Sequence, residues 1–156
     1  MTDINKEAIS LLNDLIQTSK DGEKGFHTSA EDIKNPTVKG FFITRSQECG
    51  AAVRKLQAEV RALGGDPEDS SSVGASMHRA WVDLKSAVTG KSDEAILNEV
   101  ERGEDHALKA YKEALEKATE KNLPSNVVAL IQEQLAGTQR NHDQVKEMRN
   151  QARAAS

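Results

Sequence analysis

The sequence predicts an all-α protein, an antiparallel four-helix bundle with one long crossover connection. Only 3% of the residues are aromatic, whereas β-strands favour aromatic and β-branched residues. Ala, Glu, Lys and Leu recur along the chain, and these residues favour helices. In four long segments the apolar residues are spaced three or four positions apart, as on the buried face of a packed helix. The length of 156 residues suits one domain over residues 1–156.

The first two long helices are predicted over residues 3–33 and 36–63. Pro36 disfavours helix at Asn35 and suits the first turn of a new helix, with Asn35 as the cap. The Gly-Gly-Asp-Pro run at 64–67 ends the second helix. The residues expected to face inward are Ile9, Leu12, Ile16, Phe26, Ala30 and Ile33 on the first helix, then Val38, Phe42, Cys49, Val53, Leu56, Val60 and Leu63 on the second.

The last two long helices are predicted after Ser92, which can cap the third, and over residues 124–154. The third ends at the Lys-Asn-Leu-Pro break at 121–124. The connection over 64–91 is expected to carry a short helix at about 76–89, with Trp81 as its anchor. The inward residues are Leu97, Val100, Leu108, Tyr111, Leu115 and Ala118, then Val128, Ile131, Leu135, Val145 and Met148.

This connection decides the topology. A link of such length can cross most of a helix, and two antiparallel hairpins with one long crossover have the connectivity of ferritin-like bundles. A simple up-down-up-down bundle is the alternative, but it does not need the crossover.

Charge and composition exclude several classes of function. The net charge of −4 and the pI near 5.6 are not those of a nucleic-acid binder. No apolar run approaches the roughly 18–20 residues of a membrane span, and the N-terminus does not resemble a signal peptide. Cys49 is the single cysteine, which suits a reducing cytoplasm. We therefore expect a cytoplasmic protein with neither a nucleic-acid nor a membrane partner.

Polar residues interrupt the apolar stripes at one level. Glu23, Glu104 and His142 fall on the stripes of the first, third and fourth helices, and Glu48 lies beside that of the second. Counted along the helices, each lies about 15–18 Å from the same end of the bundle. Five glycines fall near this level, at positions 22, 25, 50, 103 and 137. We expect the four side chains to converge in a polar layer inside the bundle.

Two interpretations of this layer stand side by side. Carboxylate and imidazole groups could bind iron, manganese or zinc. Alternatively, the carboxylates could form a buried ion-pair network, with Arg45 or Arg102 as the cation. Cys49 is expected to act as a small buried apolar residue. The three remaining histidines are not expected to be ligands: His27, His78 and His106.

Four sequence motifs carry a family resemblance. They are Asp21-Gly22-Glu23-Lys24-Gly25-Phe26, Arg45-Ser46-Gln47-Glu48, Leu63-Gly64-Gly65-Asp66-Pro67 and Glu101-Arg102-Gly103-Glu104-Asp105. With these motifs the chain resembles a bacterial ferritin-like four-helix-bundle family of unknown function, over nearly its whole length. The resemblance implies a ferritin-like protein of unassigned, stress-associated role.

The wider ferritin-like superfamily implies a di-iron or di-manganese carboxylate site, with one Glu on each of two helices and Glu-x-x-His on the other two. Glu23 and Glu104, or Glu101, match the single glutamates. Glu48 matches the third glutamate, but Ala51 stands where the pattern has His. On the fourth helix His142 matches the histidine of the pattern, but Gln139, three residues earlier, stands where the pattern has Glu. The candidate metal ligands are thus Glu23, Glu48, Glu101, Glu104, Gln139 and His142.

Because one histidine and one carboxylate are missing, the pattern supports a single metal ion, or none, better than a complete dinuclear centre. We therefore expect a ferritin-like protein without catalytic residues. The alternatives are a di-iron or di-manganese oxidoreductase or iron-oxidising protein, and a helical interaction module. The expected partners are a metal ion and further copies of the chain, joined through helix faces.

Overall fold

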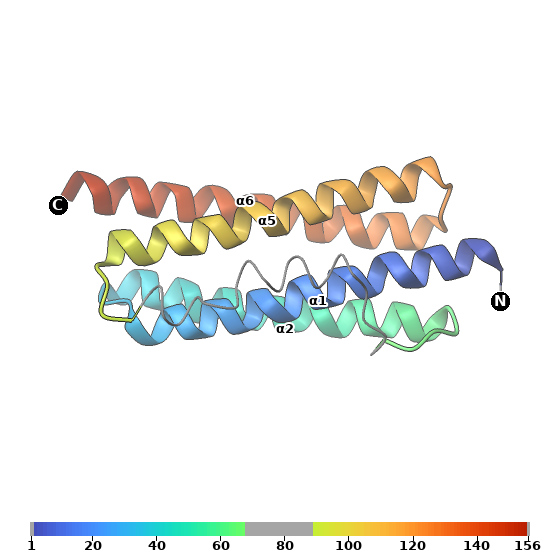
Figure 1. The fold of residues 1–156 in the computed structure, drawn as a ribbon, viewed down its shortest axis with the longest axis horizontal. Helices are drawn as coiled ribbons and strands as arrows, with labels where there is room; N and C mark the ends of the chain where they lie inside the picture. Colours follow the sequence, from blue (N-terminus) through green and yellow to red (C-terminus); the bar gives the residue numbers. More distant parts are fainter. Residues whose placement is uncertain (1, 68–88, 156) are drawn as a thin grey trace.

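The computed structural model describes residues 2–67 and 89–155, which form four long helices and no strand (Figure 1). Each helix begins and ends within one residue of its predicted position. The predicted short helix of the crossover and Trp81 lie outside the described residues. The four helices are α1 (Asp3–Asp32), α2 (Pro36–Ala62), α5 (Asp93–Glu120) and α6 (Ser125–Ala155).

Side-chain caps fix where the helices begin. The side-chain oxygen of Asn35 accepts hydrogen bonds from the backbone N–H groups of Thr37 and Val38, at 2.9 and 3.2 Å. Ser92 caps α5 by accepting from the backbone N–H of Ala95 at 3.2 Å. These bonds satisfy N–H groups that the first turn of a helix leaves without partners. Both caps confirm the sequence prediction.

The helices form two antiparallel hairpins, α1–α2 and α5–α6, which lie side by side (Figure 1). The end of α1, the start of α2, the start of α5 and the C-terminal end of α6 all lie at the same end of the bundle. The chain therefore has to cross the length of the bundle between α2 and α5. This confirms the crossover connectivity over the simple up-down-up-down alternative.

Asp93 joins the two hairpins where α5 begins. Its two carboxylate oxygens accept hydrogen bonds from the backbone N–H groups of Lys34 and Asn35, at 2.8 and 2.9 Å. Lys34 and Asn35 connect α1 to α2. One side chain thus holds the start of the second hairpin against the turn of the first.

The apolar core consists of two separate clusters, one in each half of the bundle. The cluster near the α1–α2 turn contains Phe26, Ala30, Ile33, Val38, Phe42, Cys49, Ile96, Leu97, Val100 and Val145. The cluster in the other half contains Ala8, Leu12, Leu15, Ile16, Val53, Leu56, Val60, Tyr111, Ala114, Ala118, Leu123, Val127 and Ile131. Along their helices, the buried residues Ser19 and Glu104 lie between the two clusters. Polar residues therefore interrupt the core at this level, and Glu104 is the buried one of the four residues predicted there.

Within the described ranges, no helix has a long enough apolar stretch to cross a lipid bilayer.

Candidate functional site

An ion pair between α2 and α5 lies at the centre of the polar layer. The Arg45 Nε donates to Glu104 Oε1 at 3.3 Å. Glu104 is only 1% exposed and Arg45 9% exposed. The guanidinium carbon of Arg45 also lies 5.7 Å from the centre of the Phe26 ring, within the range of a cation–π contact. The pair therefore joins the two hairpins inside the bundle.

Burial sets the protonation properties of this pair. Burial raises the pKa of Glu104, and the charge and hydrogen bond of Arg45 lower it by less, so the net direction is upward. Burial lowers the pKa of Arg45, but the acidic groups of Cys49, Glu104 and Glu48 raise it overall. The two directions are consistent because Arg45 contacts only Oε1, while the buried Oε2 of Glu104 has no hydrogen-bond partner. Arg45 thus stays cationic. Its single long hydrogen bond offsets only part of the cost of burying the charged Glu104 carboxylate.

A chain of hydrogen bonds beside the ion pair connects all four helices. The hydroxyl of Tyr111 on α5 donates to Gln134 Oε1 on α6 at 2.8 Å. Because its only proton is used there, Ser19 Oγ on α1, also at 2.8 Å, donates to the Tyr111 oxygen. Gln134 Nε2 donates to the backbone carbonyl of Ala52 on α2 at 3.3 Å. Burial raises the pKa of Tyr111 far above its ordinary value, so the phenol stays neutral.

A pocket of about 250 Å³ lies between α2 and α6 and reaches the ion pair. Its buried lining includes Arg45, Glu104 and Tyr111, and exposed side chains of α2 and α6 surround its mouth. The pocket therefore lies over the polar layer on one side of the bundle.

The expectation that Glu23 and Glu48 face inward is wrong, because both residues are exposed. On α1 the inward step after Ser19 falls on Gly22. A Cβ there would lie 3.3 Å from the Sγ of Cys49, which is tighter than an ordinary van der Waals contact, so α1 and α2 approach each other closely at this level. On α2 the inward positions are Arg45 and Cys49, four residues apart, which turns Glu48 toward the surface.

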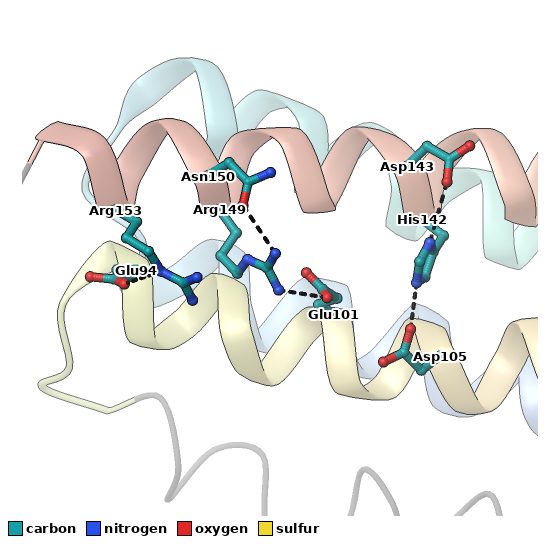
Figure 2. A network of polar contacts seen from close by, with 8 residues as sticks. All are labelled: Glu94, Glu101, Asp105, His142, Asp143, Arg149, Asn150 and Arg153. Carbon is teal, nitrogen blue, oxygen red and sulfur yellow. Dashed lines mark hydrogen bonds and ion pairs between the residues drawn. The ribbon is translucent and has the colours of Figure 1, made fainter.

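Glu101 and His142 pair with residues on the neighbouring helix of the α5–α6 hairpin, as Figure 2 shows. Arg149 Nη1 donates to Glu101 Oε1 at 2.7 Å, and the imidazole of His142 is hydrogen-bonded to Asp105. The same imidazole lies 3.4 Å from Asp143 Oδ1. These side chains form cross-links between α5 and α6.

The remaining candidate ligand, Gln139, also bonds within this surface network. Its Nε2 donates to Asp143 Oδ1 at 3.0 Å. The expected convergence of Glu23, Glu48, Glu104 and His142 is therefore not observed. Of the six candidate ligands, Glu104 is the one that lies fully buried in the polar layer.

Two further titratable groups have shifted pKa values. Burial lowers the pKa of His142, but its hydrogen bonds to Asp105 and Asp143 raise it by more, so the net direction is upward. Burial raises the pKa of the Cys49 thiol to about 12. Because the thiolate is the reactive form of cysteine, Cys49 is a buried apolar residue here, as expected.

These donors do not fit a dinuclear metal centre. In residues 2–67 and 89–155, no three His, Cys, Asp or Glu side chains lie close enough together to hold a metal ion. Glu104, the buried carboxylate, already faces the Arg45 cation. The ion-pair interpretation, with Arg45 as its cation, is the one that the contacts support. Arg102 instead pairs with Glu99 on the surface of α5.

Comparison with solved structures defines the class of fold. The structure is similar to that of ferritin-like, diiron-carboxylate proteins from Bacillus anthracis str. Ames, with a TM-score of 0.72 and 16% identity over 95% of this chain and 99% of that chain. It is also similar to the DPS protein from Vibrio cholerae O1, a member of a broad superfamily of ferritin-like diiron-carboxylate proteins, with a TM-score of 0.74 and 13% identity over 93% and 90%. The chain is thus a ferritin-like four-helix bundle.

The family is narrower than this class. Residues 7–117 match the family model DUF2383, a domain of unknown function, so the chain belongs to that family. This confirms the resemblance carried by the four motifs. A comparison with the curated proteins finds no match.

Proposed function

We propose that this protein is a non-catalytic ferritin-like protein in which a protein cation, Arg45, takes the place of a metal as the partner of the central carboxylate. The observation that carries the proposal is the buried contact between Arg45 and Glu104. The stress-associated part of the proposed role rests on the family resemblance alone.

The chemistry of the pair supports this proposal. An Arg side chain does not lose its proton in proteins, so it competes permanently with a metal ion for Glu104. A second carboxylate would have to come from Glu23 or Glu48, which are exposed. A metal ion at this level would therefore have to displace Arg45 and recruit side chains from the surface.

Elemental analysis of protein purified without chelators tests the proposal. We expect less than one iron, manganese or zinc ion per chain, and no saturable binding of these ions to the wild-type protein. The Arg45→Leu variant frees Glu104, so we expect it to bind zinc more tightly than the wild-type protein does. Lys55→Leu is the matched control, because it removes a cation from the mouth of the pocket and leaves Arg45 in place.

Two outcomes would contradict the proposal. Two tightly held metal ions per wild-type chain, lost in Glu104→Gln, would support the oxidoreductase alternative. A single metal ion that is lost in Glu104→Gln, His142→Gln or Glu48→Gln would support the weak metal site that the sequence pattern favours.

Self-association through a helix face is the second part of the proposal. Ile43 on α2 is 45% exposed and lines a groove of about 380 Å³ with Ala30 and Lys39. Burying such a side chain between two copies would stabilise a homo-oligomer. Light scattering across protein concentrations should show association that Ile43→Ser weakens, and a concentration-independent monomer would exclude it.

A further inference from the structure

The two halves of α6 are held in the bundle by different amounts of apolar burial. The apolar residues of the first half that are buried or partly buried in the core are Val127, Val128, Leu130, Ile131 and Leu135. Those of the second half, over residues 142–155, are Val145, Met148 and Ala152, and of these only Val145 is fully buried. Because tertiary packing of an apolar face supplies most of the stability of a helix in a protein, the second half is the less firmly held.

Polar contacts to α5 provide much of the attachment of the second half, as Figure 2 shows. The cross-links are Arg153 with Glu94 at 3.0 Å, Arg149 with Glu101 at 2.7 Å, and His142 with Asp105. The Arg149–Glu101 pair is the most buried of the three, with side chains 18% and 15% exposed. Ion pairs near a surface weaken when salt screens them, so this attachment depends on ionic strength.

A weak point in α6 separates the two halves. Gly137 lies inside the helix, where glycine is less favourable than alanine. The hydroxyl of Thr138 donates to the backbone carbonyl of Gln134 at 2.9 Å. In the same way, Asn141 Nδ2 donates to the carbonyl of Gly137 at 2.7 Å. Side chains that bond to a carbonyl four residues earlier compete with the backbone ladder and slightly destabilise a helix. Residues 134–141 are therefore where α6 opens most readily.

The first half of α6 is fixed to two other helices just before this weak point. Gln134 accepts a hydrogen bond from Tyr111 on α5 and donates to the carbonyl of Ala52 on α2. Glu133 forms an ion pair with Lys55 on α2 at 2.9 Å. An opening at the weak point would thus leave the first half in place.

We propose that residues 142–155 form a hinged strap, which detaches from α5 at residues 134–141 while the first half of α6 stays bound. The three cross-links to α5 hold the strap closed, so salt favours the open state. An isolated helix of about 12–15 residues is marginal in water, so the detached strap loses its helix and its amides become accessible to exchange. Opening also exposes the apolar cluster near the α1–α2 turn, against which Val145 and Met148 pack.

Native-state hydrogen exchange of the full-length wild-type protein, followed by NMR, tests the proposal. We expect the amides of residues 144–152 to share one opening equilibrium, with protection about tenfold below that of residues 127–135 and a step between the two groups. Raising NaCl from about 0.01 M to about 0.15 M shortens the Debye length from about 30 Å to about 8 Å. This change should lower the protection of the strap by about threefold and leave that of residues 127–135 unchanged.

Removing the most buried cross-link provides a second test. We expect Arg149→Met to lower the protection of the whole strap by about a further fivefold, because a half-buried ion pair is lost. Lys55→Met is the matched control. It breaks the ion pair with Glu133 in the first half of α6, so it should leave the protection of the strap unchanged.

Stiffening the weak point provides a third test. A Cβ at Gly137 would lie 3.6 Å from Arg140 Nη2, an ordinary van der Waals distance. Gly137→Ala therefore fits, and we expect it to raise the protection of the strap by about fivefold, because alanine favours the helix. Gly40→Ala is the control at an exposed position of α2, where an added Cβ would meet nothing within 4 Å, and it should not change the strap.

Ordinary fraying of a helix end is the main competing explanation. It would give protection that falls gradually toward Ala155, with no step and no common response to Arg149→Met, and that result would overturn the proposal. Equal protection of the two halves, protection of the strap that does not respond to salt, or an unchanged strap in Gly137→Ala would overturn it as well. If a variant does not fold, the exchange profiles of the wild-type protein at the two salt concentrations still decide.

Discussion

Arg45 and Glu104 depend on each other for their place in the core. Replacing Glu104 alone with Leu leaves a buried guanidinium without its carboxylate, and breaking a buried pair in this way costs roughly 3–5 kcal/mol. Replacing both, as Arg45→Met with Glu104→Leu, removes both charges, so we expect the double variant to be nearly as stable as the wild type. Urea unfolding measures the two free energies.

A loss below about 1 kcal/mol in Glu104→Leu would contradict this prediction, because breaking a buried ion pair should cost roughly 3–5 kcal/mol. It would mean that Arg45 reaches water through the pocket once its partner is removed.

His142 makes the α5–α6 hairpin sensitive to pH. Its pKa is raised in the folded protein, so its contribution to stability is fully present below the unfolded value near 6.5 and is lost as the pH rises through the folded pKa. Asp105, Asp143 and Glu104 are the charged groups that act on it. Because Asp105 and Asp143 are exposed, we expect the contribution to stay below about 1 kcal/mol.

The comparison of wild type with His142→Gln measures this contribution. The difference in unfolding free energy should be larger at pH 5.5 than at pH 9. A difference that does not change with pH would show that His142 has the same pKa in the folded and the unfolded protein.

At the residue scale, the sequence predicts which helix level is polar but not which side chains occupy it. Glu104 falls in a four-residue step of its stripe and is found inside. Glu23 and Glu48 lie one position beside the inward face, and an uncertainty of one position decides between core and surface. Arg45 precedes Cys49 by four residues on the inward face of α2, and this spacing is the signal that identifies it. The hydrogen bond between Ser19 and Tyr111 depends on how the two hairpins pack against each other. The spacing of apolar residues within one helix carries no information about this packing.

At the element scale, Gly64 ends α2 in a backbone conformation that other residues rarely adopt. Its φ is +86°, and the next residue, Gly65, donates its N–H to the carbonyl of Val60 at 2.9 Å. An L-residue in this left-handed region costs about 1–2 kcal/mol, so Gly64→Ala should be destabilised by about that amount.

Gly40→Ala on the same helix is the control for this change. It lies near the start of α2, where an added Cβ would meet nothing within 4 Å, and Ala is better than Gly in a helix by about 1 kcal/mol. Thermal unfolding should therefore show opposite changes in the two variants. Changes of the same sign would mean that Gly64 is not held in its left-handed conformation.

The helix boundaries could be predicted because each depends on local chemistry. Asn35 and Ser92 cap the helices that follow them, and Gly64 ends α2, all within a few residues of sequence. The crossover connectivity could also be predicted from the sequence, because a simple up-down-up-down bundle does not need a connection as long as residues 64–91. The pocket was not predictable, because it arises where small residues of α2 and α6, far apart in the sequence, face each other.

At the scale of the whole molecule, Asp93 is the polar contact that holds the two hairpins together at one end. Its removal in Asp93→Ala leaves two backbone N–H groups without their carboxylate acceptor, and we expect a loss of about 1–2 kcal/mol. Glu94→Ala is the control in the same turn of α5. It breaks an exposed ion pair with Arg153, which should cost less than about 1 kcal/mol.

Denaturant unfolding of both variants measures the difference. Equal losses in the two variants would indicate that Asp93 acts only through the general preference for acidic residues at a helix start.

The division of the core into two apolar clusters has a consequence for how the hairpins align. Two apolar surfaces of this length could in principle slide past each other by one helical turn, about 5.4 Å, and still bury most of their apolar residues. Such a slide would carry Glu104 away from Arg45 and into apolar surroundings, where an unpaired carboxylate is strongly disfavoured. The Arg45–Glu104 pair thus fixes the register of the two hairpins. It is formed in one alignment, and alignments shifted by a helical turn are disfavoured because they separate the two charges.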